Sequence, residues 1–301
     1  MTIAAIGYLR IASTDPNAFT SFCTDMLGLM HAGLAQDGHS QLLRMDAHPF
    51  RFRVEPSESD QLLALGLEIA TENEWQQLAE RLERAGHPCE MGSAQEAALL
   101  GVQRFFRLQD PSANTIELYH GRTLSDEPFQ SPLGIDRFIT ADDSGQDMGF
   151  GHVVVPAPEC DETTEFYTTL LGMSVCDVLS LAQPPSKVVF MHADNPRQHS
   201  VALYDQPSPA GVVHIMVEVG TLDEVGLALD RAERGGHPIV ASLGRHVNDN
   251  MCSFYVLAPG GIPFEYGYDG LQIKDWENYT ATESTEGDLW GHAYSFPGPP
   301  D

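Results

Sequence analysis

An internal repeat constrains the fold of this chain more than any other feature of its sequence. The segment GYLRIASTDPNAFTSFCTDMLGL begins at Gly7 and matches GHVVVPAPECDETTEFYTTLLGM, which begins at Gly151, at an offset of 144 residues (151 − 7). Each copy predicts a short strand, a polar turn, an amphipathic helix and a glycine that ends the helix. A fold made of two similar halves is therefore expected.

The repeat continues through the rest of both copies. LEIATENEWQQLAERLERAGHP ends at Pro88 and VEVGTLDEVGLALDRAERGGHP ends at Pro238, an offset of 150 residues (238 − 88). Each segment predicts a strand and then a helix that ends at a glycine before His-Pro, which cannot continue it. DPSANTIELYHG around Glu117 matches APGGIPFEYGYDG around Glu265, where turn residues precede a strand with a central glutamate.

The two copies predict two domains, which a length of 301 residues also favours. We expect an N-terminal domain at residues 1–134, a linker at 135–146 and a C-terminal domain at 147–272. Residues 273–301 form an acidic tail that contains Trp276 and Trp290. We expect this tail to strap over the surface.

Composition excludes several classes of function. Sixteen Lys and Arg residues against 43 Asp and Glu residues give a formal charge of −27, so no basic surface is expected that would bind nucleic acid. No segment approaches the roughly 18–20 consecutive apolar residues of a membrane span, and the N-terminus lacks the basic region of a secretory signal. Five cysteines without a CxxC pair indicate reduced thiols. These features predict a cytoplasmic protein without a membrane partner.

Three polar residues interrupt apolar, strand-like segments of the second copy. His152 stands in GHVVVP, His214 in VVHIMVEV and Glu265 in IPFEYGY. Core histidines with one satisfied hydrogen bond are the ordinary explanation of such rings, but a buried carboxylate is costly unless it is paired or bound to a metal. Two imidazoles and one carboxylate together are the ligand set of a non-haem Fe(II) site with open positions.

The first copy serves as an internal control. At the three offsets it carries Tyr8, Ala64 and Glu117, so two of the three ligands are absent. A polar residue that the fold itself required would be expected in both copies. The difference favours a functional site that only the second copy can form.

Further polar residues lie in segments that lead toward these three. LGRHVNDNMCSFY, residues 243–255, contains His246, Asn248, Asp249 and Tyr255, and reads either as a polar loop before an edge strand or as part of the site. His199 opens an alternating strand, where an exposed strand-end histidine is the ordinary interpretation.

Taken together, these motifs resemble the two-domain type I extradiol ring-cleavage dioxygenases of the vicinal oxygen chelate superfamily. GHVVV, VVHIMVEV, GRHVNDNMCSFY and FEYG fall in the family's order and at close to its distances, and the similarity runs from GYLRI at Gly7 to LWGH at Leu289–His292. The resemblance implies an α+β fold of two tandem domains. Each is built from paired βαβββ modules that form half-open barrels, and the metal lies in the second.

The resemblance also implies roles for the candidate residues. It makes His152, His214 and Glu265 the ligands of Fe(II), with Mn(II) as the less favoured metal. It makes His199 the acid–base histidine near dioxygen, and it makes His246 and Tyr255 the residues that hydrogen-bond the substrate hydroxyls. Asp249 matches a residue that supports these groups, and Asn248 lies in the same motif. We expect both Asn248 and Asp249 to line the substrate site.

The implied reaction is meta-cleavage of a catechol, in which both atoms of O2 enter the product during aromatic hydrocarbon catabolism. Val154 and Met216 lie two residues from His152 and His214, on the same strand faces, and their apolar side chains would suit a hydrophobic substrate. The likeness favours bulky catechols, 2,3-dihydroxybiphenyl or a steroid-derived catechol, over monocyclic alkyl catechols. It also suggests a homo-oligomer.

Two other functions are compatible with parts of the sequence. A glyoxalase-like metal isomerase or thiol transferase of the same superfamily would use Zn(II), Ni(II) or Mn(II), with more protein ligands that are often drawn from both modules. Tyr8 and Ala64 do not provide them. A non-catalytic, ligand-sequestering module would leave His214, Glu265 and the segment around His246 unexplained.

Overall fold

The computed structural model describes residues 2–295 and contains mostly β-strands. The strands of the first half are β1 (Ile3–Ser13), β2 (Met30–Leu34), β3 (Gln41–Arg44), β4 (Phe52–Pro56), β5 (Gln61–Ile69), β6 (Glu90–Met91), β7 (Val102–Gln109) and β8 (Thr115–Arg122). Those of the second half are β9 (Gly151–Pro156), β10 (Ser174–Ala182), β11 (Pro185–His192), β12 (Val201–Tyr204), β13 (His214–Glu218), β14 (Ile239–His246), β15 (Cys252–Leu257), β16 (Pro263–Tyr268), β17 (Thr282–Ser284) and β18 (Asp288–Trp290).

Helices connect the strands at equivalent places in the two halves. The α-helices are α1 (Pro16–Ser21), α2 (Glu72–Arg84), α3 (Ala94–Leu100), α4 (Cys160–Glu165) and α5 (Leu222–Gly235). Helix α1 continues as a π-helical turn, η1 (Phe22–Leu27), and α4 continues as η2 (Phe166–Leu170). Two short 3₁₀ turns are η3 (Pro259–Gly261) and η4 (Trp276–Asn278).

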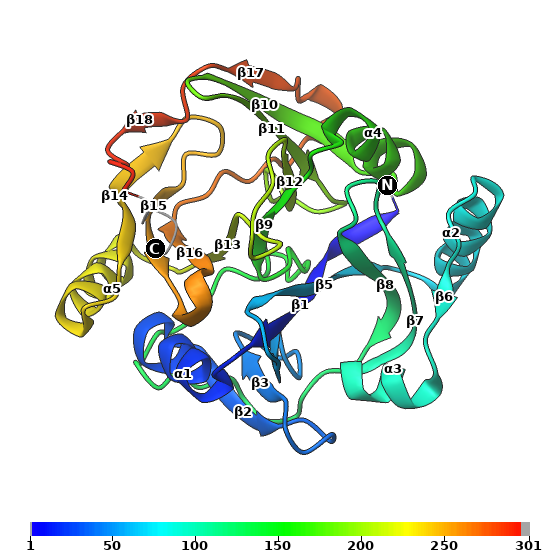
Figure 1. Ribbon diagram of the computed structural model, residues 1–301, viewed down its shortest axis with the longest axis horizontal. Helices are drawn as coiled ribbons and strands as arrows, with labels where there is room; N and C mark the ends of the chain where they lie inside the picture. The colour runs from blue at the N-terminus through cyan, green and yellow to red at the C-terminus, as the bar shows by residue number, and fades with distance from the viewer. Residues whose placement is uncertain (1, 296–301) are drawn as a thin grey trace.

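The strands form two sheets, one from each half of the chain (Figure 1). The first has the order β2-β3-β4-β1-β5-β8-β7-β6, and the second has the order β17-β10-β11-β12-β9-β13-β16-β15-β14-β18. The expected α+β architecture of two tandem, half-open barrels is confirmed. The domain boundaries at residues 134, 147 and 272 stay a prediction.

The predicted repeat extends to the register of the central strands. One row of paired residues crosses three neighbouring strands in each sheet: Tyr8, Gly66 and Glu117 in the first, and His152, Met216 and Glu265 in the second. Two residues farther along these strands, Ala64 pairs with Arg10 in the first sheet. His214 pairs with Val154 at the equivalent place in the second sheet. The sequence offsets therefore identify positions that are equivalent in space.

The long helices begin and end as the repeat predicts. Thr71 caps α2 and Thr221 caps α5, because each hydroxyl accepts a hydrogen bond from a backbone N–H three residues later. Both helices are followed by a glycine in the left-handed region, Gly86 with φ of +87° and Gly236 with φ of +69°. The His-Pro that follows prevents the helix from continuing.

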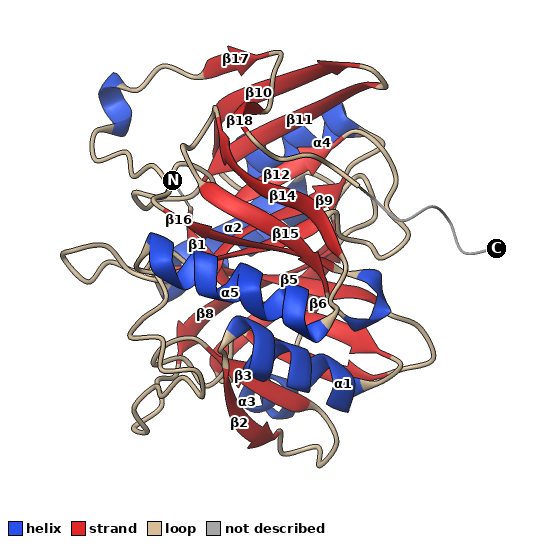
Figure 2. Ribbon diagram, turned by 90° about the vertical axis from the view of Figure 1, so that its left-hand side faces the viewer, coloured by secondary structure: helices blue, strands red, loops and turns tan. Residues whose placement is uncertain are grey.

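The helices of each half pack against helices of the other half. Helix α5 lies beside α1 and its extension η1, while α2 contacts η2, as two views of the chain show (Figures 1 and 2). Arg81 of α2 donates to the carbonyl of Leu170 at 2.6 Å, and the equivalent Arg231 of α5 donates to the carbonyl of Met26 at 3.1 Å. Each arginine thus satisfies a free carbonyl at a helix end of the other half.

The C-terminal tail is part of the second sheet rather than a strap over its surface. Strand β17 pairs in parallel with β10, and β18 pairs antiparallel with β14. The tail therefore supplies both edge strands of this sheet (Figure 2). The sequence prediction of a strap was wrong here, because strands of three residues are too short to show the two-residue alternation of apolar and polar side chains. Among residues 2–295, no helix has the length and apolar character that a membrane crossing requires.

An ion-pair network fills the place in the first sheet that matches Glu265 in the second. Glu117 is fully buried and accepts hydrogen bonds from Tyr8 at 2.8 Å and Arg10 at 2.8 Å. Arg107 lies 3.3 Å from the same carboxylate. Two guanidinium groups neutralise this carboxylate, so it needs no metal.

This network predicts a large stability effect at one position. We expect Glu117→Ala to lower the free energy of unfolding by about 3 kcal/mol, because two arginines lose their buried partner. The value lies at the low end for broken buried pairs, since the Arg10 and Arg107 side chains are 22% and 23% exposed. Urea unfolding measures it, with the exposed Glu58→Ala as control, which should change stability by about 0.5 kcal/mol at most. Equal effects of the two variants would contradict the assignment.

Candidate metal centre and pocket

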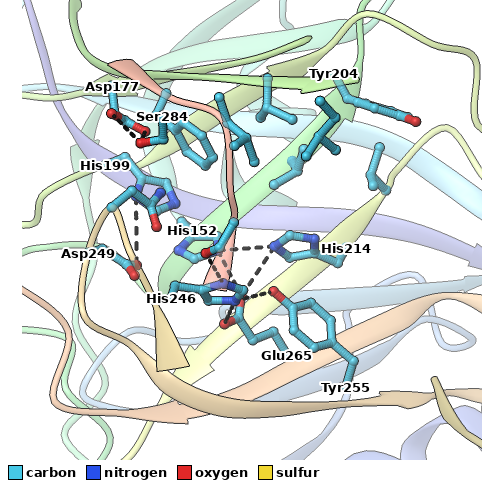
Figure 3. Close-up of a pocket in the computed structure, with 18 of the residues that line it drawn as sticks. His152, Asp177, His199, Tyr204, His214, His246, Asp249, Tyr255, Glu265 and Ser284 are labelled. Atoms are coloured by element: carbon cyan, nitrogen blue, oxygen red, sulfur yellow. Dashed lines mark hydrogen bonds and ion pairs between the residues drawn. The ribbon is translucent and has the colours of Figure 1, made fainter. Parts of the chain in front are cut away.

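A cavity of about 400 Å³ opens inside the second sheet, and most of the predicted site residues line it (Figure 3). One end is polar and carries His152, His199, His214, His246, Asp249, Tyr255 and Glu265. The walls farther out are apolar and include Leu179, Leu181, Val188, Phe190, Val213 and Pro263. A cavity with one polar end and apolar walls is typical of a small-molecule site.

Three neighbouring strands bring the predicted ligands together. His152 lies on β9, His214 at the start of β13 and Glu265 on β16, and β13 pairs with both of the others. Successive side chains of a strand alternate between its faces, so Val153 and Val155 enter the core while His152 faces the cavity. Residues 62 and 51 positions apart in the sequence (214 − 152 and 265 − 214) thus meet at one point.

The three side chains present one atom each to that point. His152 Nε2 lies 3.1 Å from His214 Nε2 and 3.1 Å from Glu265 Oε2, and His214 Nε2 lies 3.2 Å from the same oxygen. In the close-up view these three groups point toward one another (Figure 3). Such convergence of two imidazole nitrogens and one carboxylate oxygen is the arrangement of a metal-binding group.

These residues fit a metal ion with open coordination positions. Ligand atoms about 3.0 Å apart subtend right angles at an ion about 2.1 Å from each, a usual metal–nitrogen distance. His152 Nδ1 is buried and has no hydrogen-bond partner, so the ring is not held by a second polar contact. The two imidazole nitrogens face each other and one carboxylate at hydrogen-bond distance, and a cation between them would satisfy all three.

Burial and charge set the protonation of this group. Burial lowers the pKa of both His152 and His214, which favours neutral rings with a free lone pair. Burial would raise the pKa of Glu265, but hydrogen bonds from His152, His214 and His246 outweigh it and hold this pKa well below its usual value. Neutral imidazoles and an ionised carboxylate are the forms that bind metals.

His199 lies beside the group and is buried, so the interpretation as an exposed strand-end residue is wrong. It lies two residues before β12, and its ring centroid is 4.1 Å from that of His152 and 4.8 Å from that of Phe190. Its Nδ1 lies 2.6 Å from the side-chain oxygen of Gln198, which accepts its hydrogen and leaves Nε2 with a free lone pair. Burial, and after it the electrostatic interaction with the neighbouring His152 ring, places the pKa of His199 well below its usual value.

The polar segment of residues 243–255 also reaches the cavity. His246 Nε2 lies 2.8 Å from the Tyr255 hydroxyl, and Asp249 Oδ2 lies 3.8 Å from His199 Nδ1. Asn248 lines the cavity as well. Burial lowers the pKa of His246, yet Asp288 and Glu265 raise it well above its usual value, so this ring donates from both nitrogens. Burial raises the pKa of Tyr255, which keeps its hydroxyl protonated.

Of the two apolar residues expected in the pocket, only one lies there. Val154 lines the cavity, whereas Met216 does not and is fully buried. Met216 pairs with both His152 and Glu265 in the strand register, and those two side chains line the cavity whereas that of Met216 does not. The interpretation of Met216 as a substrate contact is therefore corrected.

Several residues near the site were missed. Ser253, Asp288 and His292 make hydrogen bonds to site residues or to one another. His292 ends the LWGH motif, and Ser253 lies within GRHVNDNMCSFY, so the motifs contained the signal without assigning a role. The outer apolar wall was also missed, although Leu179 and Leu181 show the two-residue alternation of a strand face.

Comparisons with known families agree with this geometry. Residues 149–266 match the Glyoxalase/Bleomycin resistance protein/Dioxygenase superfamily, and residues 6–56 match the family called dihydroxybiphenyl dioxygenase BphC D1. The first match spans all three candidate metal ligands.

Full-length relatives are similar over nearly the whole chain. An iron-dependent extradiol dioxygenase of Rhodococcus jostii (strain RHA1) is 38% identical over 306 residues, which cover 98% of each chain. A biphenyl-2,3-diol 1,2-dioxygenase of Paraburkholderia xenovorans (strain LB400) is 34% identical over 97% of this chain and 96% of the relative.

Solved structures share the fold. The crystal structure of BphC, a halotolerant catechol dioxygenase, superposes with a TM-score of 0.89 at 29% identity and covers 97% of this chain and 95% of its own. A 2,2',3-trihydroxybiphenyl 1,2-dioxygenase from Sphingomonas wittichii strain RW1 has a TM-score of 0.88 at 27% identity, with 98% and 100% covered.

The geometry predicts which histidine is needed to bind metal. We expect His214→Ala to weaken metal binding by roughly a hundredfold or more, because even the loss of a ligand's hydrogen-bond partner costs about 10–100-fold. His199→Ala, its matched control from the same cavity, should retain the metal. Metal content after dialysis against a weak chelator measures both. Equal metal loss in the two variants would contradict the assignment.

Proposed function

This chain belongs to the extradiol dioxygenases of the glyoxalase/bleomycin resistance protein/dioxygenase superfamily, and we propose that it opens the ring of a bulky, uncharged catechol beside its two hydroxyl groups. Both atoms of dioxygen enter the product. The convergence of His152, His214 and Glu265 at the polar end of an apolar cavity carries this proposal.

A metal cofactor is a feature of this family and fits the three ligands, and we propose that the metal is Fe(II) rather than Mn(II). Two histidines and one carboxylate are the set that non-haem Fe(II) oxygenases use, and the relative from Rhodococcus jostii is named iron-dependent. When bound, ferrous iron supplies Lewis acidity toward the substrate hydroxyls and a path for electrons between ring and dioxygen.

The chain's own residues bind and orient the catechol. His246 and Tyr255 both carry hydrogens that face the cavity, so they are suited to hold the substrate oxygens by hydrogen bonds. Asn248 and Asp249 border the same region. Two aligned donors fix the plane of the ring, and with it the bond that opens.

His199 is suited to move the proton. Burial keeps its ring neutral and Gln198 holds its Nδ1 hydrogen, so Nε2 can accept a proton from the substrate side and return it to the departing oxygen. His199 contributes no atom to the triad of His152, His214 and Glu265, although its ring nitrogen also converges with His152 and Asp249, and we propose a proton-transfer role for it rather than a ligand role.

The apolar walls favour a substrate larger than catechol itself. Leu179, Leu181 and Val188 extend the cavity beyond the space that one ring needs, and they exclude water from the reacting end. Relatives named for biphenyl-2,3-diol and for 2,2',3-trihydroxybiphenyl support a two-ring or larger catechol as substrate. A homo-oligomeric state, a cytoplasmic location and the absence of nucleic-acid and membrane partners stay predictions.

A direct test supplies 2,3-dihydroxybiphenyl in air to protein loaded with Fe(II). We expect one O2 consumed per catechol and a yellow ring-opened product, followed by an oxygen electrode and by absorbance. His199→Ala should lower turnover by about 100–10,000-fold, the usual contribution of a general acid–base group, with iron content unchanged. Iron binding without oxygen uptake on any catechol would contradict the proposal.

The charge of the cavity predicts its selectivity. Among the described residues that line it none is Lys or Arg, while four are acidic: Asp177, Asp249, Glu265 and Glu286. Away from the metal position and the protonated His246, a carboxylate on the substrate would meet acidic side chains and no Lys or Arg, so we expect kcat/KM for a carboxylated catechol to lie at least about tenfold below that of its methyl ester.

Glu286, on the exposed side of the cavity, tests this selectivity further. Glu286→Gln should raise kcat/KM for the carboxylated catechol relative to the ester, whereas the exposed Glu283→Gln in the same tail should leave the ratio unchanged. Equal use of acid and ester by the unmodified protein would refute the charge argument.

A further inference from the structure

Three polar residues outside the proposed catalytic set connect the C-terminal tail to the metal ligands. Asp288 lies on β18, His292 follows that strand, and Ser253 lies on β15. Ser253 is fully buried and His292 is 3% exposed, although both are polar. Buried polar groups are retained where they make specific hydrogen bonds, and each of these three does.

Asp288 contacts His246 at Nδ1, the ring nitrogen that does not face Tyr255. Its Oδ1 lies 2.9 Å from His246 Nδ1, and the Gly287 carbonyl lies 3.2 Å from the same nitrogen. Both neighbours are acceptors, so His246 donates Nδ1–H to the tail. The ring is thereby held with Nε2 directed at the Tyr255 hydroxyl, 2.8 Å away, and within 3.3 Å of Glu265 Oε1.

Ser253 contacts the carboxylate ligand in a similar way. Its hydroxyl donates to Glu265 Oε1 at 2.6 Å, and this oxygen is not the one that faces the metal ligands. The other oxygen, Oε2, lies 3.1 Å from His152 Nε2 and 3.2 Å from His214 Nε2. Ser253 therefore favours an orientation in which Glu265 presents a single oxygen to the metal position.

The contact of Asp288 with His246 forms one arm of this network, and the contact of Ser253 with Glu265 forms the other. His292 connects the two arms. Its Nδ1 lies 2.6 Å from Asp288 Oδ1, and its Nε2 lies 3.0 Å from the Ser253 carbonyl. The ring also stacks on His246, with 4.2 Å between centroids. A Cβ at Gly244 would lie only 2.5 Å from the His292 ring, so the absence of a side chain there makes room for the tail.

We propose that Asp288, His292 and Ser253 are positioning residues through which the C-terminal tail completes the site. Asp288 orients His246 toward the substrate hydroxyls, Ser253 holds Glu265 with one oxygen toward the metal, and His292 couples the two. The role of His246 toward the substrate rests on the proposed function, whereas the arm through Ser253 and Glu265 concerns metal binding, and the two arms meet where His246 Nε2 lies 3.3 Å from Glu265 Oε1.

Variants of the two arms should change different constants, the KM for the catechol in one arm and the dissociation constant for Fe(II) in the other. Asp288→Asn keeps the size of the side chain but removes the charge that holds His246. We expect it to raise the KM for 2,3-dihydroxybiphenyl by about tenfold, with kcat and the dissociation constant for Fe(II) each changed by less than about threefold. Anaerobic titration with Fe(II) against a coloured chelator gives the metal constant without any turnover.

Ser253→Ala should show the reverse pattern. We expect its dissociation constant for Fe(II) to rise by about 10–100-fold, as for other hydrogen-bond partners of metal ligands, while KM at saturating iron stays within about threefold. His292→Gln, which touches both arms, should raise both constants. Ser253→Thr restores a hydroxyl and should restore most of the metal affinity.

Controls separate positioning from general loosening. Glu283→Gln removes an exposed carboxylate from the same tail and should change neither constant. Far-UV circular dichroism and melting temperature report whether each variant folds. If Asp288→Asn does not fold, Asp288→Glu replaces it. Its carboxylate is displaced by one methylene, so this variant should also raise the KM and leave the iron affinity unchanged. Equal changes of KM and iron affinity in the Asp288 and Ser253 variants, or no change in either, would overturn the proposal.

The test also distinguishes failure of the proposed function. If the protein cleaves no catechol, no KM can be measured. The dissociation constants of Ser253→Ala and Ser253→Thr for Fe(II) still show whether this hydroxyl positions Glu265. Unchanged Fe(II) affinity in Ser253→Ala would refute the metal arm whatever the reaction.

Discussion

A buried carboxylate, Glu265, is the constraint on which the rest of the site depends. It is 1% exposed at the centre of the second sheet, and an ionised group there is costly unless cations or strong donors surround it. Neighbouring strands supply two imidazoles to one of its oxygens, and a serine hydroxyl donates to the other. A metal ion at the point where these groups converge would provide the positive charge that this arrangement requires, and apolar side chains line the cavity farther out.

The two halves of the chain satisfy the same constraint in different ways. In the first sheet the equivalent carboxylate, Glu117, pairs with the guanidinium groups of Arg10 and Arg107 and is neutralised within the protein. In the second sheet no arginine approaches within ion-pairing distance of Glu265 among the described residues, and imidazoles take that place. One fold thus carries an ion-pair network in one half and a candidate metal centre in the other. A site with ligands from both halves, as in the glyoxalase-like alternative, would draw on the equivalent positions of the first sheet, which hold Tyr8, Ala64 and the already paired Glu117.

The sequence predicts much of this arrangement because strand pairing follows the repeat. The offsets identified Tyr8, Ala64 and Glu117 as the counterparts of the candidate ligands, and the registers of both sheets confirm it. The sequence does not predict contacts between segments that share no local pattern. Burial of His199 depends on Phe190, and the pairing of His246 with Asp288 joins residues 42 positions apart (288 − 246) through a three-residue strand. Met216 was misplaced because alternation identifies a face but not what lies on top of it.

One measurement tests the central claim most directly: a crystal structure of the Fe(II)-loaded protein with anomalous diffraction at the iron edge. We predict one iron per chain, with His152 Nε2, His214 Nε2 and a single oxygen of Glu265 each about 2.0–2.2 Å from it, and with the positions facing the cavity open to substrate. An iron bound at His246, Asp288 and His292 instead, or bound by both oxygens of Glu265 with the cavity side closed by further protein ligands, would contradict the account.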